Sequence, residues 1–292
     1  MYQRTDKDFK ISVPATSANI GVGFDTLGIA FKLYNHFTFK RSENFMVSGC
    51  DKKYMNEDNL VIQSYKHIFD ILNKEYLPVS VNIDADIPVS RGLGSSATCI
   101  IAGVLSANHY LGYPLTKDEC LYHISTIEGH PDNVTPALIG KLTSAFMDDK
   151  VYYVSHDVSS KLKFVAIIPD FELSTSKARS VLPASLEYHD AINNISRVDA
   201  TIKGLENGDM KLLKAAIKDR LHEPYRRSLI KGFDVIAKMT DDNSLIYLSG
   251  AGPTIMAIFN DESLIDEFIN KLPQGYHALR LEVDDKGVII HE

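Results

Sequence analysis

The chain has 292 residues, of which 45% are hydrophobic and 24% are charged, a composition typical of a folded globular protein. Its formal net charge is −7, and no run of Lys and Arg occurs that could follow a nucleic-acid backbone. These features exclude a disordered tail, a coiled coil and a disulfide-framed miniprotein, and they predict that the protein has no nucleic-acid partner.

Three cysteines, Cys50, Cys99 and Cys120, lie far apart without a metal-binding or redox spacing, so we interpret them as thiols in a reducing compartment. The segment from Met1 to Lys10 is polar and charged, unlike a signal peptide. The most apolar stretch, residues 99–107, is too short to span a bilayer. The sequence therefore predicts a cytoplasmic protein that does not bind a membrane.

Strand-like and helix-like segments alternate in the first half of the chain. Strands are predicted at residues 10–13, 36–40 and 79–83. Apolar residues at helical spacing predict a helix from Ser95 to Leu111, and a capping box from Thr116 to Glu119 opens a second helix. Residues 142–147 and 151–155 then read as the two strands of a hairpin.

The second half has a different order of elements. A strand at 164–168 is followed by helical sequence from about 177 to 240, strands at 245–248 and 254–259, a helix at 262–272 and a strand at 277–283. Strand, helix, strand, strand, helix, strand is the order of a ferredoxin-like unit. We therefore predict an α+β protein with two domains, residues 1–155 and 156–292, although no Pro-, Gly- or Ser-rich linker marks the boundary.

The segment 88–97, with the sequence PVSRGLGSSA, lies between a predicted strand and a strongly periodic helix. Gly92 and Gly94 permit backbone conformations and close approaches that other residues avoid. Ser95 and Ser96 place hydroxyl groups at a helix N-terminus, where free N–H groups and the helix dipole favour anions. The segment is either a phosphate-binding loop or a structural turn that caps the helix.

Two familiar nucleotide loops do not fit this segment. Gly92, Gly94 and Ala97 satisfy the spacing of a dinucleotide fingerprint, but that fold needs a strand after the helix, and here a second helix follows. A Walker-type loop would end in Gly-Lys-Ser or Gly-Lys-Thr, which the segment lacks. If the segment binds phosphate, it does so as a different kind of loop.

Two further segments combine glycines with polar residues between predicted strands. Residues 13–25 read VPATSANIGVGFD, and residues 248–254 read LSGAGPT. Each by itself is compatible with an ordinary turn. Together with the loop at 88–97, and in this order, they resemble the three motifs of the GHMP kinases, the superfamily of galactokinase, homoserine kinase, mevalonate kinase and phosphomevalonate kinase.

This resemblance covers nearly the whole chain and is closest to the homoserine kinases, because residues 16–25, 128–134 and 220–226 are similar to the signatures of those enzymes. The sequence departs from the pattern at Lys231, Lys141 and the pair Thr98-Cys99, none of which removes a polar group assigned to chemistry. The resemblance implies a two-domain GHMP kinase fold, with an N-terminal ribosomal protein S5 domain 2-like domain and a ferredoxin-like C-terminal domain. It also implies a homodimer that uses ATP and Mg²⁺ to phosphorylate the side-chain hydroxyl of L-homoserine.

The resemblance assigns roles to individual residues. The nucleotide site would consist of Asn59 near the base and of Pro88, Val89, Ser90, Arg91, Gly92, Leu93, Gly94, Ser95, Ser96, Ala97 and Thr98. Ser96 and Glu128 would bind Mg²⁺, and both are counted with Asp132 and Asn133 as catalytic. The substrate would be bound by Asn19, Asp25, His130, Asn133, Thr175, Arg179, Arg226 and Gly252.

Within the substrate set, Asn19 and Asp25 would take the amino end, and Arg179 and Arg226 the carboxylate. His130 and Asn133 would line the pocket near the reacting hydroxyl. Whether Asp132 acts as a base stays open, because phosphoryl transfer depends mainly on positioning and charge neutralisation.

Two alternative functions also stay open. One is a GHMP kinase that acts on another small alcohol, such as mevalonate or a sugar, and the other is a non-catalytic sensor of a nucleotide or metabolite. The combination of Asp25 with two arginines favours an amino acid, because mevalonate has no ammonium group. The presence of Ser96 and Glu128 favours an enzyme over a sensor.

Overall fold

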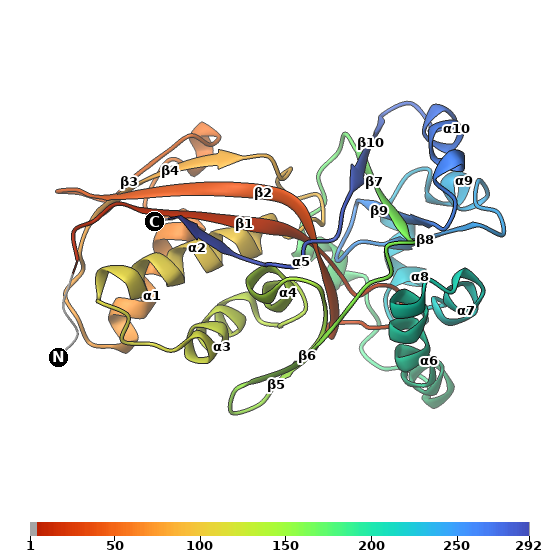
Figure 1. Cartoon of the computed structure of the whole chain (residues 1–292), viewed down its shortest axis with the longest axis horizontal. Coiled ribbons are helices and arrows are strands. Elements are labelled where there is room, and N and C mark those ends of the chain that lie inside the picture. The colour runs from red at the N-terminus through yellow and green to blue at the C-terminus, as the bar shows by residue number, and fades with distance from the viewer. Residues whose placement is uncertain (1–4, 292) are drawn as a thin grey trace.

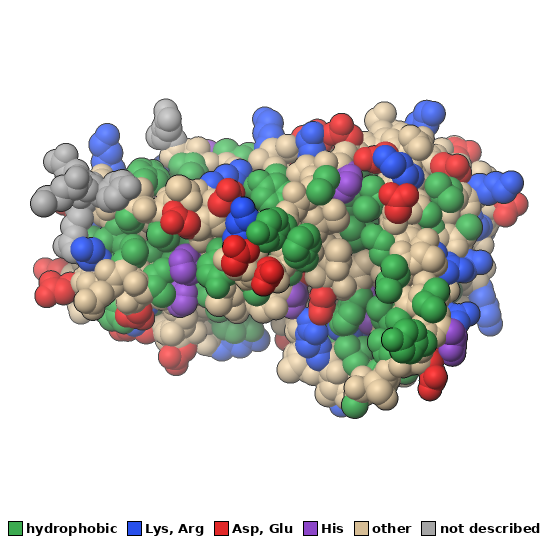
Figure 2. Space-filling model, turned by 90° about the horizontal axis from the view of Figure 1, so that it is seen from below, with side chains coloured by type: hydrophobic (Ala, Val, Ile, Leu, Met, Phe, Trp, Pro, Cys, Tyr) green, Lys and Arg blue, Asp and Glu red, His purple; other side chains and the backbone are tan. Residues whose placement is uncertain are grey.

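Two β-sheets with helices packed against them make up residues 5–291, the part of the chain that the computed structural model describes (Figure 1). The prediction against a signal peptide rests on the polar segment from Met1 to Lys10. Residues 1–4 of that segment lie outside the described range. None of the helices in residues 5–291 is both long and apolar enough to cross a membrane. On the face in Figure 2, basic side chains are scattered among acidic ones and form no continuous stripe.

The first sheet has seven strands in the order β11-β1-β2-β4-β3, with the hairpin β5–β6 attached to β2. Its strands are β1 (Phe9–Ala18), β2 (Leu27–Arg41), β3 (Met46–Ser48), β4 (Val79–Ala85), β5 (Leu142–Met147), β6 (Val151–His156) and β11 (Ile289–His291). The helices of this half are α1 (Leu60–Ile71), α2 (Ser95–Tyr110), α3 (Lys117–Glu128) and α4 (Val134–Ile139). The predicted hairpin and the predicted helices at 95 and 116 are confirmed, and the capping box of Thr116 and Glu119 is formed.

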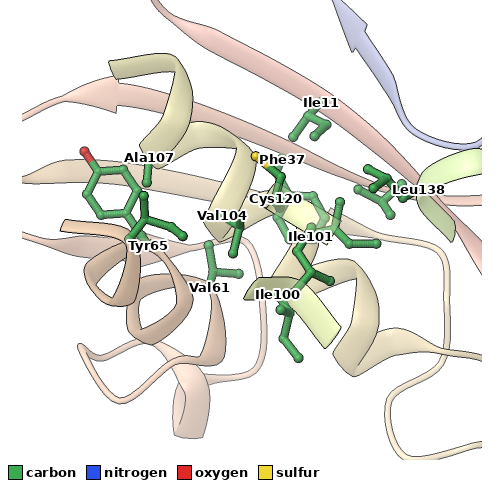
Figure 3. Close-up of a cluster of buried hydrophobic side chains, with 14 of the residues drawn as sticks. Ile11, Phe37, Val61, Tyr65, Ile100, Ile101, Val104, Ala107, Cys120 and Leu138 are labelled. Atoms are coloured by element: carbon green, nitrogen blue, oxygen red, sulfur yellow. The ribbon is translucent and has the colours of Figure 1, made fainter. Parts of the chain in front are cut away.

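Helix α2 forms the centre of this half because it is apolar on nearly every side (Figure 3). Ile101 and Val104 pack in one core with Phe37 of β2 and Val61 of α1. Gly103 allows α1 to come close, since a Cβ atom there would lie 2.4 Å from the carbonyl oxygen of Val61. A rigid helix therefore supports the loop that precedes it.

The second sheet has the antiparallel order β10-β7-β9-β8, which is the ferredoxin-like order predicted from the sequence. Its strands are β7 (Lys163–Pro169), β8 (Ser244–Leu248), β9 (Ile255–Phe259) and β10 (Tyr276–Leu281). The helices of this half are α5 (Thr175–Ser180), α6 (Tyr188–Asn207), α7 (Met210–Ala216), α8 (Glu223–Arg226), α9 (Phe233–Ala237) and α10 (Ile265–Asn270). The helical sequence predicted at 177–240 is thus divided into several short helices.

Both faces of the second sheet are buried, as the alternation along β7 illustrates. Phe164 and Ala166 share a core with Leu205 of α6 and Leu213 of α7, whereas Val165 shares another core with the residues of α9 and α10. Side chains alternate between the two faces of a strand. An apolar strand of this length therefore needs helices on both sides.

The core beneath α6 and α7 also joins the two halves of the molecule. Ile29 and Phe31 of β2 belong to it, and the ring of Phe31 packs edge-on against Phe164 of β7 at a centroid distance of 5.2 Å. Strands β1 and β2 extend beyond the predicted residues 10–13 and 36–40, and their extended ends reach this core. Their pairing register shifts between Pro14 and Ala15. One core is therefore shared by both halves, in addition to the core around α2 in the first half and the core beneath α9 and α10 in the second.

Strand β11 returns from the second half and pairs with β1 at the edge of the first sheet. The division into residues 1–155 and 156–292 stays a proposal. Strand β11 belongs to the second part by sequence but pairs in the sheet of the first part. Three residues at the end of a chain carry too little periodic pattern to be predicted as a strand.

Candidate active site

A cavity of about 300 Å³ opens where loops from both halves meet, and residues of all the predicted site segments line it. The predicted residues that line it are Asn19, Asp25, Asn59, Val89, Ser90, Arg91, Gly92, Gly94, Ser95, Ser96, Glu128, His130, Asp132, Asn133, Thr175, Arg179, Arg226 and Gly252. Pro88, Leu93, Ala97 and Thr98 do not line it. Leu93, Ala97 and Thr98 are fully buried and hold the loop from behind.

The loop at 88–97 forms one wall of the cavity and has the backbone that its glycines predicted. Gly92 and Gly94 have φ angles of 77° and 75°, which favour glycine. Gly94 is the N-cap of α2, and no side chain caps this helix end, so its first N–H groups remain available to an anion. A Cβ atom at Gly94 would lie 2.1 Å from Oγ1 of Thr16, which shows how closely the loop lies on β1.

Arg91 lies in this loop, and its guanidinium is bound to the protein itself. Nε donates to the carbonyl oxygen of Pro169 at 3.0 Å, Nη2 to that of Asp170 at 2.9 Å and Nη1 to that of Val89 at 3.2 Å. Two of these bonds reach the end of β7 in the second half. Arg91 therefore holds the loop against the segment that leads to Thr175 and Arg179.

One end of the cavity is mainly apolar. It is lined by residues that the sequence analysis did not assign to the site: Cys50, Tyr54, Leu60, Ile83, Ala85 and Cys99. Burial raises the pKa of Cys99 to about 12, so this thiol is neutral. Asn59 caps α1, accepting from the N–H of Val61 at 2.9 Å and donating to the carbonyl oxygen of Tyr54 at 2.9 Å. One N–H of its amide remains for a ligand such as a base.

Glu128 lies at the C-terminal end of α3, facing the start of α2. Ser96 Oγ donates to Glu128 Oε1 at 3.2 Å. Burial raises the pKa of Glu128, and the nearby His130 offsets this only in part. A hydroxyl and a carboxylate are the hard oxygen donors that Mg²⁺ takes, and a divalent cation would stabilise the ionised form of this half-buried acid. The two residues therefore fit the metal site that the resemblance implies.

His130, Asp132 and Asn133 follow on the turn between α3 and α4. Asp132 is buried, and its Oδ1 lies 2.5 Å from Nδ1 of His130. Burial lowers the pKa of His130, but the hydrogen bond and charge of Asp132 outweigh burial and raise it. Oδ1 of Asn133 accepts a hydrogen bond from Oγ1 of Thr16 at 2.8 Å. This bond sets the orientation of the amide and therefore the direction of its N–H groups.

Asp25, His130 and Asp132 are the three groups in residues 5–291 whose ligand atoms lie close enough, within 4.8 Å of one another, to hold a metal ion. None of the three is among the predicted Mg²⁺ ligands. The raised pKa of His130 favours the imidazolium, which cannot bind a metal. A protonated His130 repels a metal ion, so the cluster is not assigned as the metal site.

Charged groups of both signs surround the substrate end of the cavity. Asp25 Oδ1 pairs with Arg179 Nη2 at 2.8 Å, and Asn19 accepts from the backbone N–H of Asp25 at 3.0 Å. Arg226 is almost completely buried, and both guanidinium groups lie over the ring of Phe24, at 5.1 Å for Arg226 and 5.6 Å for Arg179. The sequence predicted Arg226 as a ligand, but only the fold shows that it is buried.

Two GHMP kinase family models match the chain: the N-terminal domain model at residues 59–141 and the C-terminal model at residues 201–278. The chain therefore belongs to the GHMP kinases, as its fold and its glycine-serine loop indicate. Its sequence is 44% identical to a protein of Clostridium botulinum (strain Okra) named homoserine kinase, over 97% of this chain and 98% of that protein.

Solved structures agree with this similarity. A homoserine kinase from Cytophaga hutchinsonii superimposes with a TM-score of 0.84 at 26% identity, over the full length of both chains. A putative homoserine kinase from Listeria monocytogenes gives a TM-score of 0.80 at 27% identity, over 97% of this chain and 99% of that one. The predicted fold class and superfamily are thereby confirmed.

Proposed function

We infer that this protein is a kinase that transfers a phosphoryl group from ATP to the side-chain hydroxyl of L-homoserine. GHMP kinases use ATP as the phosphate donor. One observation carries the choice of acceptor: a carboxylate, Asp25, and two guanidinium groups, Arg179 and Arg226, face the same cavity as the loop at 92–96. A zwitterionic amino acid needs an anion for its ammonium group and a cation for its carboxylate.

In this proposal the nucleotide extends from the apolar end of the cavity to the N-terminus of α2. The base would contact Asn59, and the phosphates would accept from the free N–H groups of residues 94–96. Ser96 and Glu128 would hold Mg²⁺, which neutralises charge on the phosphates. Thr175 and Gly252 line the cavity beside the proposed acceptor and would limit its size.

We propose that the acceptor hydroxyl is aligned by Asn133 and is not deprotonated by Asp132. The carboxylate of Asp132 is already paired with His130, and Asn133 is oriented by Thr16. Catalysis would then come from alignment, from Mg²⁺ and from the loop amides.

The test is release of ADP from Mg-ATP by the purified protein, measured with L-homoserine, mevalonate, galactose or no acceptor. Release with homoserine alone is the expected result. Release with mevalonate or galactose would support a different acceptor, and nucleotide binding without release would support a sensor. Mevalonate is disfavoured because it has no group to pair with Asp25.

The homodimer that the resemblance implies and the cytoplasmic location that the composition predicts are part of this proposal. Sedimentation equilibrium of the full chain tests the first, and fractionation of cells that express the protein tests the second.

A further inference from the structure

His222 lies behind Arg226 and is not exposed to solvent. It belongs to the segment 220–226, but no substrate contact was expected of it. Its ring stacks on Phe24 at a centroid distance of 5.0 Å and an interplanar angle of 18°. Nε2 lies 2.8 Å from the carbonyl oxygen of Gly21, and Nδ1 lies 3.4 Å from Nη1 of Arg226.

The partners of His222 determine where its proton lies. The carbonyl oxygen of Gly21 can only accept a hydrogen bond, so Nε2 must carry a hydrogen. In a neutral imidazole the other nitrogen is then an acceptor. Nδ1 therefore presents a lone pair to the guanidinium of Arg226, which has only donors to offer.

This lone pair completes a set of acceptors around one side of Arg226. Nε donates to the carbonyl oxygen of Ala178 at 3.2 Å, and Nη1 donates to that of Gly250 at 3.1 Å as well as to His222. Nη2 has no hydrogen-bond partner in residues 5–291, although Arg226 lines the cavity. These bonds hold the planar guanidinium in place through Nε and Nη1, and Nη2 remains available to a ligand.

Arg226 needs such fixing because its surroundings oppose its charge. Burial lowers its pKa, and the neighbouring Arg179 lowers it further. Two guanidinium groups repel each other unless an anion lies between them. Without a ligand, the acceptors behind Arg226 and the face of the Phe24 ring oppose that repulsion.

We propose that His222 is a positioning residue for the acceptor substrate: its Nδ1 lone pair orients Arg226 toward the substrate carboxylate. This inference rests on the proposed function, because it takes the acceptor to be an amino acid. It predicts that His222 affects the affinity for the acceptor and leaves ATP binding unchanged. A residue that only fills space or holds the Gly21 loop would not show this selectivity.

Two substitutions separate the two hydrogen bonds of His222. In His222→Asn, the side-chain oxygen can take the place of Nδ1 and accept from Arg226, but the donor to Gly21 is lost. In His222→Gln, the amide reaches the position of Nε2 and can donate to Gly21, but no acceptor faces Arg226. Each variant thus keeps one of the two contacts.

The measurement is steady-state kinetics with L-homoserine and Mg-ATP varied separately. This hydrogen bond to a charged group is long, so its loss should cost on the order of tenfold, which corresponds to about 1.4 kcal/mol. We expect His222→Gln to raise the KM for homoserine about tenfold, with kcat and the KM for ATP within about threefold of the wild-type values. His222→Asn should stay within about threefold of wild type in all three constants.

The reverse ranking, with Asn impaired and Gln normal, would overturn the proposal, as would an equal rise in the KM for ATP. If either variant fails to fold, nitrogen NMR of the wild-type imidazole decides: the expected tautomer carries hydrogen on Nε2 only, and hydrogen on Nδ1 would refute the inference. A wild-type protein that does not phosphorylate homoserine would count against the proposed function, whereas the tautomer of His222 tests the inference separately.

Discussion

Replacing Arg91 by alanine should weaken ATP binding by removing the contacts that hold the loop at 88–97 on the second half of the molecule. Arg91 donates two hydrogen bonds to carbonyl oxygens of Pro169 and Asp170 across that boundary, and its side chain is only 15% exposed. Its ion pair with Glu172 is long, at 3.8 Å, and adds little. The two cross-boundary bonds therefore determine the size of the effect.

A hydrogen bond from a charged donor contributes about 1.5–3 kcal/mol. Water can reach the carbonyl oxygen of the exposed Asp170 in the variant, so we take about 0.5 kcal/mol for that bond and about 1.5 kcal/mol for the bond to the buried Pro169, or roughly 2 kcal/mol together. That free energy corresponds to roughly a 30-fold change in an equilibrium constant. Other contacts remain, including that of Ser249 Oγ with the carbonyl oxygen of Gly92 at 2.6 Å, so the loop should loosen without unfolding.

The assay is the KM for Mg-ATP together with the melting temperature. Arg91→Ala should raise the KM for ATP about 30-fold. Arg280→Ala is the control, because Arg280 lies on the surface, pairs there with Glu262 and Asp266, and does not line the cavity. An Arg91→Ala variant that melts like the wild type and binds ATP within twofold of it would refute the reasoning.

Four further predictions concern the rest of the site and the turn at 132–136. Glu128→Gln should abolish most Mg-dependent turnover, by at least about 100-fold in kcat. It should also raise the melting temperature at pH 7. The pKa of Glu128 is raised in the folded protein, so ionisation of this carboxyl opposes folding at pH values above its unfolded pKa. The gain in melting temperature should therefore vanish below about pH 4. An equal gain at pH 7 and below pH 4 would contradict this.

Asp132→Asn should keep the fold and reduce kcat by less than about 100-fold, whereas a loss of several thousand-fold would establish a general base. Gly28→Ala should lower the urea midpoint, because its Cβ atom would lie 1.7 Å from the carbonyl oxygen of Asp132 and 2.8 Å from Pro136 Cγ. We expect a cost of about 3 kcal/mol or more, and an unchanged midpoint would show that the turn at 132–136 can move.

The His130–Asp132 pair also predicts a pH dependence of stability. The pKa of His130 is raised in the folded protein, so its contribution is fully present below the unfolded pKa of about 6.5 and is lost as pH rises through the folded value. Urea midpoints measured from pH 6 to pH 9 should fall for the wild type, relative to His130→Gln, over that range. Parallel curves for the two proteins would rule out this linkage.

Much of the fold follows from local patterns in the sequence. Helix α2, the capping box at the start of α3, the hairpin β5–β6 and the succession of elements along the second half all match short-range signals. The loop at 88–97 was recognised because glycines at fixed positions before a helix have a physical purpose. The sequence analysis missed the short strands β3 and β11 and also helix α1, although Val61, Tyr65 and Ile68 recur there at helical spacing and Asn59 caps its start.

Motifs identified the candidate site, but they did not describe its geometry. A charged residue in a sequence is most often a solvated surface group, and Arg91, Arg179 and Arg226 look alike there. In the structure Arg91 binds backbone carbonyls, Arg179 pairs with Asp25, and Arg226 is buried behind Phe24. These differences depend on partners distant in the sequence.

The sequence by itself determined the superfamily, the two-part order of elements and the residue types that could bind a nucleotide and an amino acid. Its glycines and caps act through neighbouring residues, so their effects can be read locally. Only the tertiary structure decided that the two halves share a core, that Arg91 binds the loop to the second half, and that Nδ1 of His222 faces Arg226. Such contacts arise when packing brings distant segments together, and no pattern of spacing along the chain specifies them.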